Sequence, residues 1–405
     1  MYLTPAQDKI LKGESGEAMR LAMELVTRLG DVYEADKLVP IASSHTLAHF
    51  SSLHQAGIDL LEKFASLGGR FSVYTTVDPA SVEFGRWNEL GFPKAYVKKQ
   101  MRLRRAYLAM GGIPSWTCTP YQSCNIPRCG QCLAWAESSA VCYVNSVIGA
   151  KTNKIPGGLD VSCAILGMTP NFGLLLPENR IGQVLFKIDK MELSDLDYSS
   201  IGYMIGKMTG DKIPAIEGLP LDAGEDQLKV LGAAANATGS VPLYHAVGIT
   251  PEAPTLKQAC GGEKPGEVIT LTRLELTQAE SELNTSDEEP DLIAIGIPHC
   301  SLKEIQETAR LLLGRRVKEN IRFWIFTSKY VDKLASEMRL KRTIEDTGAK
   351  LLTTACGDNL PVSILGIRSI MTTSAKMVHA LEGEYNIGAR YASLEECIRI
   401  GTVSK

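Results

Sequence analysis

Apolar and polar positions in the first third of the chain follow helical and extended periods in turn. Residues 15–29 place their apolar side chains on one face, which predicts an amphipathic helix, and residues 53–67 predict another. Short apolar runs at 38–42 and 71–75 predict strands beside these helices. Helices that alternate with strands are typical of a parallel sheet covered by helices.

The middle of the chain is less regular. Residues 94–110 predict a helix whose basic face we interpret as solvated. The segment 111–131 is rich in Gly, Pro and Cys and predicts an irregular loop. The mostly apolar stretch 133–148 predicts a buried helix.

This predicted helix carries a polar stripe. Ser138, Cys142 and Asn145 fall on one side of it, and Glu137 lies next to them. Buried polar groups cost free energy unless they are bonded. The stripe therefore predicts a ligand pocket, and a hydrogen-bonded packing seam is the alternative.

The last third has the pattern of a doubly wound α/β unit. The acidic, turn-rich segment 278–290 is the best linker candidate. After it, four predicted strands alternate with helices at 303–313 and 329–347. These strands are 291–297, 321–326, 350–354 and 369–372. We therefore divide the chain into an N-terminal region of two subdomains, 1–285, and a doubly wound unit with a C-terminal return, 286–405.

Charge and hydropathy exclude several classes of protein. The 405 residues include 43 Lys and Arg against 46 Asp and Glu, a net charge of −3, which excludes a strongly basic nucleic-acid binder. No apolar run reaches the ~18–20 residues that span a membrane, and the N-terminal residues lack the apolar core of a signal peptide. We expect a cytoplasmic protein without a nucleic-acid or membrane partner.

Cysteine is the informative residue type. The ten thiols should stay reduced in the cytoplasm. Five of them lie between residues 118 and 142, and such clustering of reduced cysteines favours metal or redox chemistry. Cys129-x-x-Cys132 has the spacing that begins a zinc site, but no second pair follows at a suitable distance.

Ligands of open α/β sheets bind beyond the carboxyl ends of the strands. Cys300, Cys356 and Lys376 follow three predicted strands of the last unit, so we expect them at one sheet edge. A thiolate there is close to helix N-termini, which favour metal binding, although a small buried apolar role is the alternative. With Cys118 from the irregular loop, three thiols would suit an iron–sulfur cluster that leaves one iron open as a Lewis acid.

Several motifs resemble the aconitase X family over nearly the whole chain. They are Trp116-Thr-Cys118-Thr-Pro-Tyr121, Ala134-Trp-Ala-Glu137-Ser138-Ser-Ala140, Asn145-Ser-Val-Ile-Gly-Ala150, Ile297-Pro-His-Cys300, Thr354-Ala-Cys356 and Thr373-Ser-Ala-Lys376. The resemblance implies an aconitase-like α/β fold of several parallel or mixed sheets flanked by helices. It also implies a dehydratase, built from a large part that carries the metal ligands and a small swivelling part that carries the catalytic serine. The chain resembles the large part, so a separate small subunit is expected.

The resemblance also assigns residues. It implies Cys118, Cys300 and Cys356 as ligands of an iron–sulfur cluster, [4Fe–4S] or a smaller cluster or single iron. Glu137 and Ser138 are the implied catalytic residues. The implied substrate contacts are Leu47, Ala48, His49, Asp78, Pro79, Glu137, Ser138 and Lys376.

The substrate implied by the resemblance is a small hydroxy acid. Our first expectation is (R)-5-phosphomevalonate, dehydrated to trans-anhydromevalonate 5-phosphate, and cis-3-hydroxy-L-proline is the alternative. A non-enzymatic iron–sulfur scaffold or redox sensor that uses Cys124, Cys129 and Cys132 is a distant alternative. The chain departs from the family at four places. Ile297 stands where cysteine is common, Cys132 where histidine is common and Asp78 where asparagine is common, and residues 47–49 differ from Gly-Val-Ser.

Overall fold

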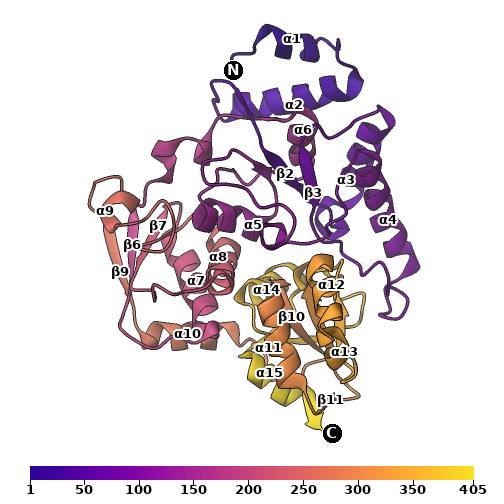
Figure 1. Cartoon of the computed structure of the whole chain (residues 1–405), viewed down its shortest axis with the longest axis vertical. Coiled ribbons are helices and arrows are strands. Elements are labelled where there is room, and N and C mark those ends of the chain that lie inside the picture. Colours follow the sequence, from indigo (N-terminus) through magenta and orange to yellow (C-terminus); the bar gives the residue numbers. More distant parts are fainter.

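The computed structural model describes residues 1–405 apart from the side chain of Glu384. The chain forms three bodies, each built on a parallel sheet, and they follow one another along the sequence (Figure 1). No helix in the described part of the chain is long and apolar enough to cross a bilayer.

The first body contains a short sheet of order β3-β2-β4 with all pairs parallel. An antiparallel pair, β1 with β5, lies apart from this sheet. The strands are β1 (Leu38–Pro40), β2 (Ser43–Thr46), β3 (Tyr74–Val77), β4 (Ala134–Trp135) and β5 (Met168–Pro170). The helices are α1 (Pro5–Leu11), α2 (Glu17–Val32), α3 (Phe50–Ser66), α4 (Lys94–Ala109), α5 (Ser138–Tyr143) and α6 (Leu159–Leu166). Short helical turns cover Pro120–Gln122, Val144–Ile148, Gly173–Leu175 and Pro177–Arg180.

The second body has a parallel sheet of order β8-β7-β6-β9. Its strands are β6 (Val184–Ile188), β7 (Pro214–Glu217), β8 (His245–Ala246) and β9 (Glu267–Leu271). Its helices are α7 (Asp195–Thr209), α8 (Glu225–Gly239), α9 (Leu256–Ala259) and α10 (Arg273–Leu283). The expected linker at 278–290 therefore begins inside α10, because Leu276, Ala279 and Leu283 bury one face of that helix.

The third body has a five-stranded parallel sheet of order β13-β12-β10-β14-β15. Its strands are β10 (Leu292–Cys300), β12 (Arg322–Thr327), β13 (Lys350–Leu352), β14 (Ser369–Thr372) and β15 (Gly388–Tyr391), beside the antiparallel pair β11 (Arg315–Val317) and β16 (Thr402–Ser404). Its helices are α11 (Leu302–Leu312), α12 (Lys329–Glu337), α13 (Leu340–Glu345), α14 (Ala375–Ala380) and α15 (Leu394–Gly401), with helical turns at Gly357–Asn359 and Leu381–Tyr385. Strand β10 is buried throughout, as a central parallel strand should be.

Two predicted helices are wrong in extent. The stretch 133–148 begins as strand β4, because Trp135 pairs with His45 of β2, and α5 starts only after Glu137 caps it. The predicted helix 329–347 is divided into α12 and α13 at Arg339, whose φ of 61° lies in the left-handed region.

Candidate functional site

The first and third bodies meet at the carboxyl ends of their strands. Ala80, just after β3, forms a parallel bridge with Ala355, and its amide donates to the carbonyl of Thr354 at 2.7 Å. The Glu83 carboxylate accepts the amides of Thr353 and Thr354, each at 2.9 Å. Functional residues that are far apart in sequence thereby come to one place.

Two of the expected thiols form a buried pair at this junction. The sulfur atoms of Cys118 and Cys356 lie 3.9 Å apart, and the amide of His299 donates to the Cys118 sulfur at 3.3 Å. Candidate ligand atoms of Cys118, His299 and Cys356 all lie within 4.8 Å of one another, and all three residues are buried. His299 is a candidate that the sequence reasoning missed, although it lies inside the motif 297–300.

The His299 ring is held by two hydrogen bonds. Its Nε2 lies 2.9 Å from the carbonyl oxygen of Ala355, which can only accept, so Nε2 donates and Nδ1 accepts from the Thr117 hydroxyl at 3.0 Å. Burial lowers the pKa of His299 to about 4, so the imidazole is neutral near pH 7. Because both ring nitrogens are already bonded, His299 lies beside the thiol pair without a free nitrogen lone pair in this structure.

The donor set fits an iron centre. Two thiolates with metal–sulfur bonds of ~2.3 Å span roughly 3.8 Å on a tetrahedral ion, close to the observed sulfur separation. Thiolate and imidazole ligands suit iron and iron–sulfur groups, and an amide that donates to a sulfur tunes such a group. Cys118 and Cys356 would hold the group, with His299 next to them.

Cys300 does not join this pair. Its side chain packs with Ile293, Ile295 and Ile305 in a core cluster separate from the one that holds Cys118 and Cys356. The register of β10 shifts between Ile295 and Cys300, and it is Ile297 that shares the core cluster of the two thiols. The structure therefore assembles two of the three predicted thiol ligands.

A buried ion-pair cluster includes Lys376. Its Nζ lies 2.9 Å from Glu137 Oε1 and 3.0 Å from Asp358 Oδ2, and all three side chains are at most 10% exposed. Burial lowers the pKa of Lys376, but the two carboxylates outweigh this and hold it well above its usual value. The Lys376 ammonium, an implied substrate contact, is therefore already paired with two carboxylates.

Glu137 also begins helix α5. Its carboxylate accepts the Ala140 amide as an N-cap and the Ser139 hydroxyl at 2.8 Å. Ser138 is partly exposed, and its hydroxyl makes no hydrogen bond within the described residues. Further along, the predicted stripe is a packing seam, because the Asn145 side chain bonds the backbone of Thr152 and Pro242.

The remaining predicted contacts lie together on two adjacent loops. Leu47, Ala48 and His49 follow β2, Asp78 and Pro79 follow β3, and these strands are parallel neighbours. Asp78 is fully buried, and its oxygens lie 3.4 Å from Nε2 of His45 and of His49 without reaching hydrogen-bond geometry. Burial raises the pKa of Asp78, but the two imidazoles lower it further than burial raises it.

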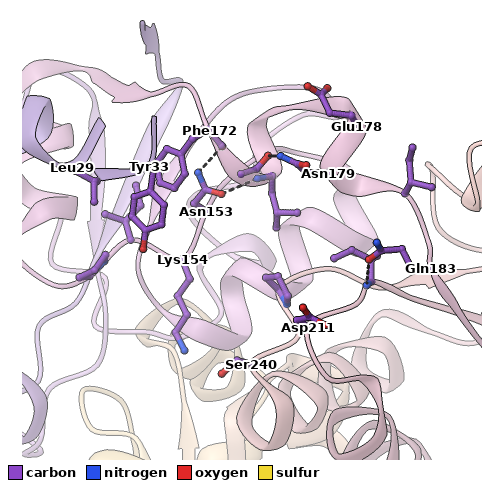
Figure 2. A pocket seen from close by; sticks show the side chains of 17 residues that line it. Leu29, Tyr33, Asn153, Lys154, Phe172, Glu178, Asn179, Gln183, Asp211 and Ser240 are labelled. Carbon is purple, nitrogen blue, oxygen red and sulfur yellow. Dashed lines mark hydrogen bonds between the residues drawn. The ribbon is translucent and has the colours of Figure 1, made fainter. Parts of the chain in front are cut away.

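Other candidate features lie apart from this site. Cys124, Cys129 and Cys132 form no ligand cluster among the described residues, so the scaffold alternative gains no support. A cavity of about 670 Å³ lies between the first two bodies, where Tyr33 stacks on Phe172 (Figure 2). It is lined by neither the paired thiols nor Lys376.

Comparisons with known proteins agree with this geometry. The sequence models of the aconitase X first, second and third domains match residues 1–178, 182–281 and 290–402. The phosphomevalonate dehydratase large subunit of Methanocaldococcus jannaschii is 38% identical over 98% of this chain and 100% of its own length. The cis-3-hydroxy-L-proline dehydratase of Pseudomonas aeruginosa is also 38% identical, over 96% of this chain but 68% of its own length.

A solved structure extends the likeness to the fold. The holo-form crystal structure of Thermococcus kodakaraensis aconitase X has a TM-score of 0.91 and 36% identity, and covers 99% of this chain and 100% of its own. This match confirms the predicted fold class. The relatives are named dehydratases, which are hydro-lyases, so the expected enzyme class is confirmed as well. The chain belongs to the aconitase X family.

Proposed function

We propose that this chain is the large subunit of an iron-dependent hydro-lyase that dehydrates (R)-5-phosphomevalonate to trans-anhydromevalonate 5-phosphate. The observation that carries the proposal is the convergence of the thiol pair, the Lys376 cluster and the two loops at one junction of strand ends. The large subunits named for this reaction match the chain from end to end, which supports both the substrate and a separate small subunit.

The cofactor that we propose is an iron centre held by Cys118 and Cys356. When bound, it supplies a Lewis acid for the departing hydroxyl group. A [4Fe–4S] cluster that also uses Cys300 would require that side chain to leave its core, so the described packing favours the smaller cluster or single iron. Lys376 neutralises charge beside this centre and holds Glu137 in place.

The reaction removes a proton from one carbon and hydroxide from its neighbour. We assign Glu137 and Ser138 to the substrate side of this site, because the family resemblance implies both as catalytic residues and Ser138 has an unbonded, partly exposed hydroxyl at the start of α5. The proton would pass to the serine of the small subunit, which the family resemblance places there. Closure of that subunit would exclude water from the site.

One observation favours cis-3-hydroxy-L-proline as a second candidate. Both Asp78 oxygens are buried and accept no hydrogen bond from the described residues. The ring ammonium of an imino acid could donate to Asp78, whereas a phosphate near this carboxylate would be repelled.

The test is an assay of the complex with its small subunit on both substrates, with product detected by chromatography. Turnover of 5-phosphomevalonate alone supports the first candidate. Turnover of cis-3-hydroxy-L-proline alone, lost in Asp78→Asn, supports the second. No turnover of either would contradict both.

A further inference from the structure

Gln100 is a buried polar residue on the apolar face of α4. It is 0% exposed, and its neighbours on that face, Val97 and Leu103, are buried apolar residues. Burying an amide costs free energy unless its donors and acceptors are satisfied. An apolar residue would fill the same space without this cost, so the role of the Gln100 amide must lie in its hydrogen bonds.

Its partners are backbone atoms of the two loops that follow β2 and β3. Nε2 donates to the carbonyl of Ala48 at 2.8 Å, and Oε1 accepts the amide of Phe50 at 2.9 Å. Oε1 also accepts the amide of Ser81 at 3.1 Å. One side chain therefore joins the loop 47–50 to the loop 78–81.

These loops carry the residues assigned to substrate. His49 lies between Ala48 and Phe50, and Asp78 lies three residues before Ser81, with 3.4 Å between His49 Nε2 and Asp78 Oδ2. Ser81 adds a second link, since its hydroxyl accepts the Ser51 amide at 3.0 Å. The relative placement of His49 and Asp78 thus depends on a small set of buried bonds, in which Ala48 is the one implied substrate contact and takes part through its backbone carbonyl.

We propose that Gln100 is a positioning residue, which fixes the two substrate loops against each other without touching substrate. This inference rests on the proposed function in one respect, namely that the loops 47–50 and 78–81 contact substrate. A misplacement of about 1 Å at a reacting group costs on the order of 100-fold in rate. The structure gives Gln100 the position to prevent such a displacement.

The test compares Gln100→Met, which removes all three bonds, with Gln100→Glu, which keeps the oxygen that accepts from Phe50 and Ser81. In the complex with the small subunit, Gln100→Met should lower kcat/KM by roughly 10- to 100-fold on whichever substrate the wild type turns over. Iron content should stay at the wild-type level. Hydrogen exchange at the Phe50 and Ser81 amides should become faster in Gln100→Met and return toward the wild-type rate in Gln100→Glu.

The matched control is Gln7→Leu. Gln7 is also buried, and its side-chain oxygen accepts the amide of Thr4 at the N-terminal cap of α1. Gln7→Leu should leave kcat/KM unchanged. Wild-type kcat/KM in a folded Gln100→Met, or unchanged exchange at Phe50 and Ser81, would overturn the proposal. If Gln100→Met does not fold, kcat/KM and hydrogen exchange are measured in Gln100→Glu instead. Rapid exchange at the Phe50 and Ser81 amides in that variant would overturn the proposal, because Gln100→Glu keeps the oxygen that accepts from both. Exchange is measured without substrate, so it remains decisive even if neither expected substrate is turned over.

Discussion

Asp160 is a buried carboxyl that bonds the start of the loop 47–50, which is proposed to contact substrate. It accepts the amides of Leu47 at 2.8 Å, Gly158 at 2.6 Å and Val161 at 2.7 Å. Burial raises the pKa of Asp160 to about 7, although these amides and the nearby His45 lower it. Since the ordinary pKa of an aspartate is near 3.8, the folded protein binds this proton more tightly than the unfolded chain.

This difference predicts a pH dependence of stability. The contribution of Asp160 should be complete below about pH 4, decline as the pH rises toward 7, and be absent above that, because only the folded state is still protonated in this window. We expect the free energy of unfolding of the wild type, relative to Asp160→Asn, to fall between pH 4 and 7 in urea titrations. A difference that rises over this range would contradict the assignment.

A second prediction at the scale of single residues concerns the iron content of cysteine variants. Cys118→Ser and Cys356→Ser should each remove most of the iron and the visible absorbance from anaerobically purified protein, because their sulfurs form the buried pair. Cys300→Ser should retain the iron, since this thiol packs in another core cluster. Cys163→Ser, also buried, is the control. Loss of iron in Cys300→Ser would instead support Cys118, Cys300 and Cys356 as three thiol ligands.

At the scale of elements, the start of α5 holds one residue with both a structural and a proposed chemical role, Glu137, beside one with a proposed chemical role alone, Ser138. Glu137 caps the helix and pairs with Lys376, so its replacement by Ala should lower both stability and turnover. Ser138→Ala removes a hydroxyl without a described partner, so turnover should fall by at least ~100-fold while Tm stays nearly unchanged. Thermal unfolding beside steady-state kinetics checks this. A lower Tm with normal turnover would indicate that Ser138 is a packing residue.

The same elements show what the pattern of residues can predict. Rules for parallel sheets brought Cys356 and Lys376 to strand ends, and the structure has them there, whereas the loops after β2 and β3 were indicated by the family resemblance. The rules could not choose between Cys300 and His299, because the irregular end of β10 sets which side chain faces the junction. Nor could they show that Lys376 is paired with two carboxylates, because Asp358 lies on a helical turn after β13 and Glu137 comes from the first body.

At the scale of the whole molecule, the proposed site lies where the first and third bodies meet. We expect the chain alone to bind iron without dehydrating either substrate, because the base that removes the proton is assigned to the small subunit. Addition of the purified small subunit should restore turnover of one of the two. Robust turnover by the isolated chain would place the base on this chain instead.

The paired thiols also have a consequence for biosynthesis. Cys118 and Cys356 are 238 residues apart in the chain, so a ribosome that adds ~5–20 residues per second makes them roughly 10 to 50 seconds apart. During that interval the first thiol has no partner with which to bind a metal. The proposed centre could therefore be loaded only after the third body has been made and has docked on the first, and in a nascent chain that stalls before this point Cys118 lacks the thiol with which it pairs.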